Sequence, residues 1–299
     1  GEGTTGLNVR GGSIDQNLVL MDEAPLFNTS HLFGFFSVFN QDAVRDVSLQ
    51  RGGISAQYGG RASSILDVRL KYPNSEQFSV SGGIGLVSSR LTLEGPLIKN
   101  KLSTLLAVRA SFNDFLFQIG PKSLRDTRAN FYDITNKWLW NINDRNELTL
   151  SAYYSQDSFK IPADSVATLD VNASSSLFGY SNLATTLNWT RHIREGVRLE
   201  AVGTLSRYDA RISVPDSVNA LELVSAITYK SGKIQYSHRT TRPHQYLAGL
   251  SAIGYTILPN DLRPGPFSNV LPLTLDTERA AELAAFAEDE WKINTRVSL

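Results

Sequence analysis

From residue 76 to its end, this chain alternates apolar and polar residues with a period of two. The alternation is clearest at residues 102–112, 148–154 and 197–205. Successive side chains of a strand point to opposite faces, so the pattern predicts antiparallel strands with one apolar and one polar face. The longest apolar runs fall far short of the ~20 residues that a membrane-spanning helix needs. Any part of this chain that spans a membrane must therefore do so as a closed barrel of strands.

The connections between these runs alternate in length. Outer-membrane barrels have short turns at one end and longer loops at the other, so the alternation favours a barrel wall over a soluble sandwich. Counting by this parity gives about ten strands, paired in sequence order as a continuous meander over residues 72–299. Short joins are expected at residues 95–101, 142–146, 192–196, 240–245 and 292–296, and longer segments at 113–130, 155–177, 208–220 and 258–278.

The same alternation assigns side chains to the two faces of the wall. Apolar positions of one strand are predicted to face lipid, and its polar positions the lumen. The lipid-facing set is Leu199, Ala201 and Leu205, and the lumen-facing set is Arg198, Glu200 and Thr204. Aromatic residues near strand ends suit the head-group level of a membrane, although Tyr and Trp favour strands in any protein. These residues are Trp138, Trp140, Trp189, Tyr153, Tyr154, Tyr180, Tyr208, Tyr255 and Trp291.

The first 70 residues have a different pattern, rich in glycine pairs and mixed in secondary structure. Residues 18–21 form a short apolar run that predicts a buried strand. Residues 31–40 have a spacing that predicts a short helix, with one face formed by Leu32, Phe35, Phe36 and Phe39. Paired glycines follow where the backbone needs a positive φ or approaches another segment closely. This order predicts a small α+β domain ahead of the strands.

Four elements of this domain occur in a specific order: Asn8-Val9-Arg10-Gly11-Gly12, Leu20-Met21-Asp22 with Pro25, Asp46-Val47 through Arg51-Gly52-Gly53, and Tyr58-Gly59-Gly60-Arg61. In this order they resemble the plug domain of TonB-dependent outer-membrane receptors. The likeness is closest to the subgroup with a carboxypeptidase-regulatory-like domain ahead of the plug. Many plugs of the family carry Asp-Gly where this chain has Asp22-Glu23, so the turn there is expected to differ. The resemblance covers about the first quarter of the chain.

The resemblance implies a plug at residues 1–72 and the N-terminal part of a transmembrane β-barrel at residues 73–299, with about ten of about 22 strands. It also implies a receptor of the Gram-negative outer membrane that takes up a scarce ligand, a siderophore, a glycan or a similar molecule. The implied partners are membrane lipid, the inner-membrane energy transducer TonB and, as a further candidate, a surface lipoprotein. Because no signal peptide is visible, we expect the chain to be a fragment.

Composition excludes several other classes of protein. Lys plus Arg and Asp plus Glu are equal at 29 each, so no excess of basic charge is present to bind nucleic acid. The sequence has no cysteine, and its four histidines show no metal-binding spacing. Asp22 and Glu23 suggest calcium, but two adjacent carboxylates at a strand end are more often turn residues. We therefore predict no enzyme activity, no metal and no cofactor. A soluble all-β carbohydrate-binding module remains the alternative.

Two sets of site residues follow from the resemblance and from charge. The family's plug apex faces the ligand, which carries over to Arg10, Gly11, Gly12, Asp15, Tyr58 and Gly59. Arg10 is equally suited to an internal pair with Asp67 or Asp22. The second set is predicted to hold the plug in the barrel through ion pairs with the wall. The alternative is that the plug residues of this set form ion pairs within the plug. The second set consists of Arg51, Arg61, Asp67, Arg109, Arg198 and Glu200.

Overall fold

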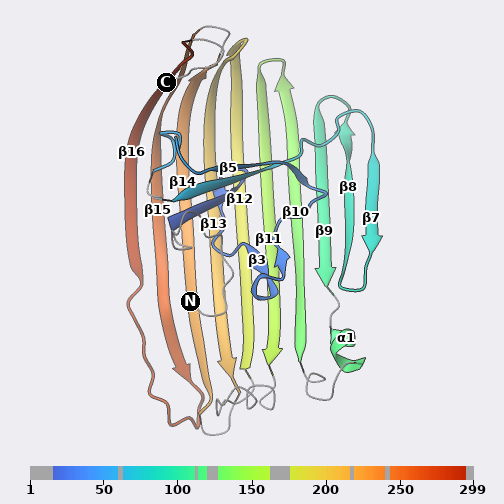
Figure 1. Cartoon of the computed structure of the whole chain (residues 1–299), viewed down its shortest axis with the longest axis vertical. Coiled ribbons are helices and arrows are strands. Elements are labelled where there is room, and N and C mark those ends of the chain that lie inside the picture. The colour runs from blue at the N-terminus through green and yellow to red at the C-terminus, as the bar shows by residue number, and fades with distance from the viewer. Residues whose placement is uncertain are drawn as a thin grey trace.

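A ten-stranded antiparallel sheet forms most of the molecule, and a small four-stranded sheet packs against one of its faces (Figure 1). The computed structural model describes residues 16–59, 63–111, 114–119, 127–161, 176–215, 219–239 and 243–293. We call the ten-stranded sheet the wall, and the described residues from 16 to 72 the N-terminal unit. The face of the wall that packs against the N-terminal unit is its inner face.

Each strand of the wall pairs with the next strand in sequence, from β7 to β16. The predicted up-and-down order and the count of ten strands are thus confirmed for the described residues. No helix in this part of the chain is long and apolar enough to cross a membrane. The wall strands are β7 (Ser79–Ile84), β8 (Ser88–Ile98), β9 (Leu102–Ser111), β10 (Arg128–Asn143), β11 (Asn146–Ile161), β12 (Ser176–Arg194), β13 (Val197–Val214), β14 (Leu221–His238), β15 (His244–Pro264) and β16 (Glu278–Trp291). A short helix, α1 (Asp114–Ile119), follows β9.

From β8 to β16, short turns lie at one end of the wall, the upper end in Figure 1, and longer connections at the other. The segment 208–220 differs from its prediction as a long polar connection, because β13 continues to Val214 and β14 begins at Leu221. Residues 155–161 are likewise strand. Charged side chains such as Asp209 and Arg211 alternate here with inward aromatic and aliphatic ones, so the extended strand resembles a polar loop in the sequence.

The N-terminal unit is built on a sheet with the order β2-β1-β6-β5. Its strands are β1 (Asn17–Met21), β2 (Ala24–Pro25), β5 (Val44–Gln50) and β6 (Ser64–Leu70). The predicted strand at 18–21 is therefore correct. Met21 and Leu70 share one buried apolar cluster with Leu105, Tyr153 and Ala184 of the wall. The two sheets thus form a common core instead of two separate ones.

The predicted helix at residues 31–40 is wrong. A hairpin takes its place, with β3 (Ser30–His31) and β4 (Phe36–Ser37) joined by the single 3-10 turn η2 (Leu32–Gly34). Leu32 has a φ of 50° and Gly34 a φ of 103°, which no α-helix accommodates. The helical spacing of apolar residues arises because Leu32 and Phe36 pack together with Phe131 of the wall.

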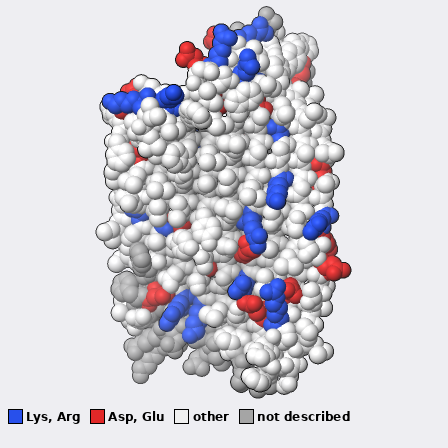
Figure 2. Space-filling model, turned by 180° about the vertical axis from the view of Figure 1, so that it is seen from behind, with Lys and Arg blue, Asp and Glu red and all other residues white. Residues whose placement is uncertain are grey.

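Alternate residues of β13 face opposite sides of the wall, as predicted. Glu200 and Thr204 are buried on the inner face, while Leu199, Ala201 and Leu205 lie partly exposed on the outer face. Figure 2 shows the outer face, where a band below the charged upper edge is largely free of charged residues. Nearer the longer connections this face carries ion pairs, such as Arg207 with Asp209.

Only part of the aromatic set predicted for a membrane interface lies on the outer face. The strand register places Trp138, Trp140 and Trp189 there, near the short turns. Tyr153 is instead almost wholly buried under the N-terminal unit. Three further tyrosines of the set, Tyr180, Tyr208 and Tyr255, are also in register with inner-face residues. The prediction used distance from strand ends, which does not distinguish the two faces.

Candidate functional site

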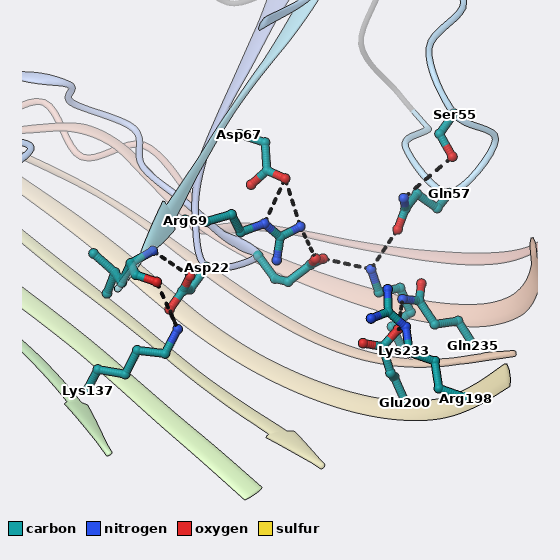
Figure 3. A network of polar contacts seen from close by, with 12 residues as sticks. Asp22, Ser55, Gln57, Asp67, Arg69, Lys137, Arg198, Glu200, Lys233 and Gln235 are labelled. Carbon is teal, nitrogen blue, oxygen red and sulfur yellow. Dashed lines mark hydrogen bonds and ion pairs between the residues drawn. The ribbon is translucent and has the colours of Figure 1, made fainter. Parts of the chain in front are cut away.

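A strained two-residue turn, Asp22-Glu23, joins β1 to β2 and points two carboxylates at the wall (Figure 3). Both residues have positive φ, 45° for Asp22 and 76° for Glu23. This conformation suits Asn-Gly in a tight hairpin and is unfavourable for glutamate. The turn is held in place because both side chains bind cations, as the next two contacts show.

Asp22 forms a buried link between β1, β6 and the wall. Its Oδ2 accepts hydrogen bonds from Lys137 Nζ at 2.7 Å and Ser151 Oγ at 2.6 Å. Its Oδ1 accepts one from the backbone N–H of Leu70 at 3.0 Å. The Lys137 side chain is only 6% exposed, so its ammonium depends on Asp22 for charge compensation. These contacts fix the turn against β10 and β11.

Glu23 connects a second cation of the wall to the N-terminal unit. Its Oε2 accepts from Lys233 Nζ at 2.7 Å, and its Oε1 from Arg69 Nη2 at 2.6 Å. Lys233 also donates to Gln57 Oε1 at 3.2 Å. Burial alone would raise the pKa of Glu23, but Lys233 and Arg69 outweigh it and lower that pKa to about 2. The resulting stabilisation is complete above pH 4.5 and is lost as the pH falls towards 2.

His31 anchors the β3–β4 hairpin between two carboxylates of the wall. Its Nδ1 lies 2.9 Å from Asp157 Oδ2, and its Nε2 lies 3.4 Å from Asp133 Oδ2. The imidazole stacks on Phe131, with ring centroids 4.2 Å apart. Arg109 completes the cluster by donating to Asp133 Oδ2 at 2.6 Å and to the carbonyl oxygen of Ser37 at 2.7 Å. Burial lowers the pKa of His31, but hydrogen bonds to the two carboxylates raise it more, above its ordinary 6.5.

We expect this His31 contact to loosen at high pH. The protonated imidazole stabilises the docked hairpin fully below pH 6.5, and the stabilisation disappears as the pH rises through the raised pKa. The sequence has no cysteine, so a nitroxide on Phe35→Cys, a site 82% exposed, reports this hairpin alone. Its mobility should increase between pH 6 and pH 10. In the matched His31→Gln variant the mobility should not change with pH, and equal pH dependence in both proteins would contradict the assignment.

Two weaker contacts tie the N-terminal unit to the ends of the wall. Asp42 pairs with Arg90 of β8 at 2.9 Å. At the other edge, Glu288 Oε2 of β16 accepts from Ser55 Oγ at 2.6 Å and from the backbone N–H of Ala56 at 2.8 Å. The N-terminal unit therefore contacts wall strands from β8 to β16.

Of the residues predicted to form ion pairs across this interface, one contacts the N-terminal unit and three pair within their own strand. Arg109 does bind the N-terminal unit, through the carbonyl of Ser37. Asp67 binds Arg69 at 2.7 Å, because residues two apart on β6 share a face, so this pair lies within the N-terminal unit. Arg198 and Glu200 are 3.5 Å apart on β13. Arg51 is exposed, and Arg61 lies outside the described residues.

The predicted ligand residues divide into two groups. Arg10, Gly11, Gly12 and Asp15 lie outside the described residues. Tyr58 and Gly59 line a cavity of about 390 Å³ between the N-terminal unit and β13–β16. A second, strongly polar cavity of about 370 Å³ lies beside the Asp22-Glu23 turn and extends to Arg198. Within the described residues, no cluster of three or more His, Cys, Asp or Glu side chains is suited to a metal ion.

The predicted set of ion pairs lacks the residues that form the principal contacts across this interface. These are Lys137 and Lys233 from the wall and Asp22, Glu23 and His31 from the N-terminal unit. One feature of the sequence could have identified the two lysines as interface residues. Each lies at an inner-face position of an alternating strand, where a long cation needs a counter-charge. The partner of each lysine was not recognisable, because the two contacts span 115 and 210 residues.

Comparison with known proteins identifies the N-terminal part. The sequence model described as TonB-dependent Receptor Plug Domain matches residues 1–64. Among proteins with curated descriptions, none matches the chain significantly.

Solved structures match nearly the whole chain in fold. The siderophore receptor PirA from Acinetobacter baumannii has a TM-score of 0.65 at 15% identity, covering 94% of this chain and 47% of that one. The ferripyoverdine receptor of the Pseudomonas aeruginosa outer membrane has a TM-score of 0.68 at 12% identity, covering 93% and 43%. The outer membrane transporter YddB from Escherichia coli has a TM-score of 0.61 at 10% identity, covering 94% and 46%. The chain thus spans less than half of each of these structures.

Proposed function

We propose that this chain is part of a TonB-dependent receptor, with a plug domain followed by part of the barrel wall, and that it takes up a scarce ligand across the Gram-negative outer membrane. In this proposal residues 1–72 are the plug and residues 73–299 belong to the barrel. TonB in the inner membrane supplies the energy by pulling on the plug. The outer face of the wall contacts lipid, and a surface lipoprotein is a further candidate partner.

The observation that carries the proposal is the way in which the plug is held. Three anchors from the plug, Asp22, Glu23 and His31, bind charged groups of the wall. Buried ion pairs add little net stability once desolvation is counted, yet they enforce a specific geometry. When water enters the interface, it solvates both partners of a pair, so separating them costs less than exposing an apolar core of equal area. Such an interface favours a plug that moves and then returns to the same place.

The two cavities beside these anchors fit the same proposal. The Glu23 pair with Lys233 lies where they meet, because Glu23, Gln57, Tyr58 and Val202 line both. Movement of the Asp22-Glu23 turn would join the two spaces into one passage along the inner face. The positive φ values of the turn favour its release once the carboxylates lose their cations.

A reversible cross-link tests whether the plug must move. Cysteines replacing Ser55 and Glu288, which are in contact across the interface, can be joined by a short bis-maleimide that contains a disulfide. In the full-length receptor in cells, we expect the cross-link to abolish energy-dependent uptake, while ligand binding at equilibrium stays within about twofold. Reduction of the linker should restore uptake.

The controls are the double-cysteine protein without linker and a receptor whose linker lacks the disulfide. Full uptake by the cross-linked receptor would refute plug movement at this edge of the wall.

The alternative, a soluble carbohydrate-binding module, is disfavoured by the outer face. Leu187, Ile234, Leu250 and Leu283 cluster there and are each at least about half exposed. Water would contact this apolar area in a soluble protein, whereas lipid covers it in a membrane. A full-length protein that stays monomeric without detergent would support the soluble alternative.

A further inference from the structure

The cavity of about 390 Å³ between the plug and β13–β16 has a lining that indicates what kind of ligand it accepts. Its volume lies within the range of small-molecule sites. The plug contributes Phe27 and Tyr58, and the wall contributes Tyr229 and Tyr255. Six aliphatic side chains also line the cavity, namely Leu18, Leu20, Val202, Ile227, Ile253 and Ile257, and Gln57, Thr204, Ser231 and Ser251 add polar groups.

Among the described residues that line this cavity, no cation is free. Lys233 is bound to Glu23 at 2.7 Å and to Gln57 at 3.2 Å. The remaining charged residue of the lining is Glu282, which is exposed on β16. The formal charge of the lining is therefore −1, from Glu23, Glu282 and Lys233. From these described residues, an anionic ligand would meet repulsion and find no unpaired cation.

Four other inward cations among the described residues of the wall are also compensated. Arg90, Arg109, Lys137 and Arg198 each lie within 3.5 Å of a carboxylate oxygen. A ligand that carries several negative charges would have to displace one of these carboxylates first, which leaves it buried and unpaired.

The aromatic groups are arranged to receive a ring. Tyr229 and Tyr255 are direct partners on β14 and β15, with centroids 5.4 Å apart and planes 71° apart. Outside the cavity, Tyr180 and Tyr208 form a stacked pair on the same face of β12 and β13, with centroids 6.3 Å apart and planes 8° apart. Tyrosine offers an apolar ring face together with a hydroxyl that can bind a polar substituent.

We propose that this cavity binds an uncharged part of the ligand that presents an apolar ring face, the chemistry shared by an aryl group and by one face of a sugar ring. The inference rests on the proposed uptake function and makes its substrate class more specific. Tyr229, Tyr255 and Tyr58 provide the ring contacts. The paired Glu23 and Lys233 form the polar end of the site and need no charge from the ligand.

Binding to the full-length receptor in lipid nanodiscs tests this assignment without any transport step. The probes are benzyl alcohol for the aryl ring, methyl glucoside for the sugar ring, and a ferric tris-catecholate complex as an anion. Saturation-transfer NMR detects weak binding of the two neutral probes, and titration calorimetry detects the anion. We expect at least one neutral probe to bind, and the comparison of the two identifies the kind of ring.

Two matched variants on β14 locate the binding. Tyr229→Ala removes a cavity ring, whereas Tyr236→Ala removes an outer-face tyrosine of the same strand. We expect Tyr229→Ala to weaken the neutral probe about fivefold or more, the usual size of an aromatic contact. Tyr236→Ala should leave the affinity unchanged. Tyr229→Phe, which keeps the ring and its packing, should retain binding.

Two results would overturn the inference: saturable binding of the anion alone, or equal neutral binding in Tyr229→Ala and Tyr236→Ala. Neither result would contradict the proposed uptake function. A receptor that binds only the anion, and whose uptake of it stops on cross-linking, would still be an uptake receptor. Conversely, neutral binding at Tyr229 together with unimpeded uptake by the cross-linked protein would refute plug movement and leave the binding site in place.

Discussion

Asp22→Asn is expected to weaken the attachment of the plug to the wall by about 3–5 kcal/mol, the cost of stranding one partner of a buried ion pair. Asparagine keeps the shape of aspartate and tolerates the positive φ of this position, so the turn itself should persist. What changes is Lys137, whose buried ammonium loses its counter-ion. Hydrogen exchange of β1, β2 and β6 in the full-length receptor should accelerate by a factor that corresponds to this free energy.

The matched control is Asp46→Asn. Asp46 also pairs with an adjacent cation, Arg45 at 2.7 Å, but about half of each side chain is exposed. Exposed pairs contribute about 0–1 kcal/mol, so this variant should exchange almost as the parent does. If Asp22→Asn behaved like Asp46→Asn, the ion pair with Lys137 would not be what holds the plug.

Ala201→Arg is expected to destabilise the membrane-inserted receptor by about 2–4 kcal/mol, the cost of an arginine on the lipid face of a barrel near the bilayer midplane. Ala201 lies on the outer face of β13 between Trp189 of β12 and Ile234 of β14. Its neighbours are apolar, so they offer the guanidinium no partner. The measurement is the free energy of unfolding from lipid vesicles in a denaturant titration.

Ser181→Arg provides the comparison on the same face. Ser181 is the direct partner of Asp209, within the charged region of the outer face. Near an interface the same arginine costs only about 0–1 kcal/mol. An equal loss at Ala201 and Ser181 would show that the region around Ala201 is not in contact with hydrocarbon.

The wall was largely predictable because its signal is local and repeated. Each strand has its own alternation, and pairing with the next strand needs only a short turn, as between β12 and β13. Residues such as Glu200 and Thr204 could thus be assigned to a face from the sequence. A short apolar run, also a local signal, located β1 in the plug correctly.

The site was less predictable because its contacts are distant in sequence. Lys233 meets Glu23 across 210 residues, and no local pattern relates the two. The hairpin at His31 was read as a helix because three phenylalanines and a leucine fit helical spacing, although glycine and tertiary packing decide its backbone. Arg109 was assigned correctly to the inner face, yet its partner in the plug is a backbone carbonyl, to which charge patterns give no clue.

A nitroxide scan along β13 of the full-length receptor, reconstituted in lipid bilayers, tests the central claim most directly. Single cysteines at positions 199–206 each carry a spin label, and collision with oxygen and with a water-soluble nickel complex reports lipid and water. Positions 199, 201, 203 and 205 should collide with oxygen, whereas 200, 202, 204 and 206 should be protected from both reagents by the plug. Deletion of residues 1–72 should open the even positions to nickel. Uniform exposure to nickel along the strand, or no alternation at all, would contradict a membrane wall that encloses a plug.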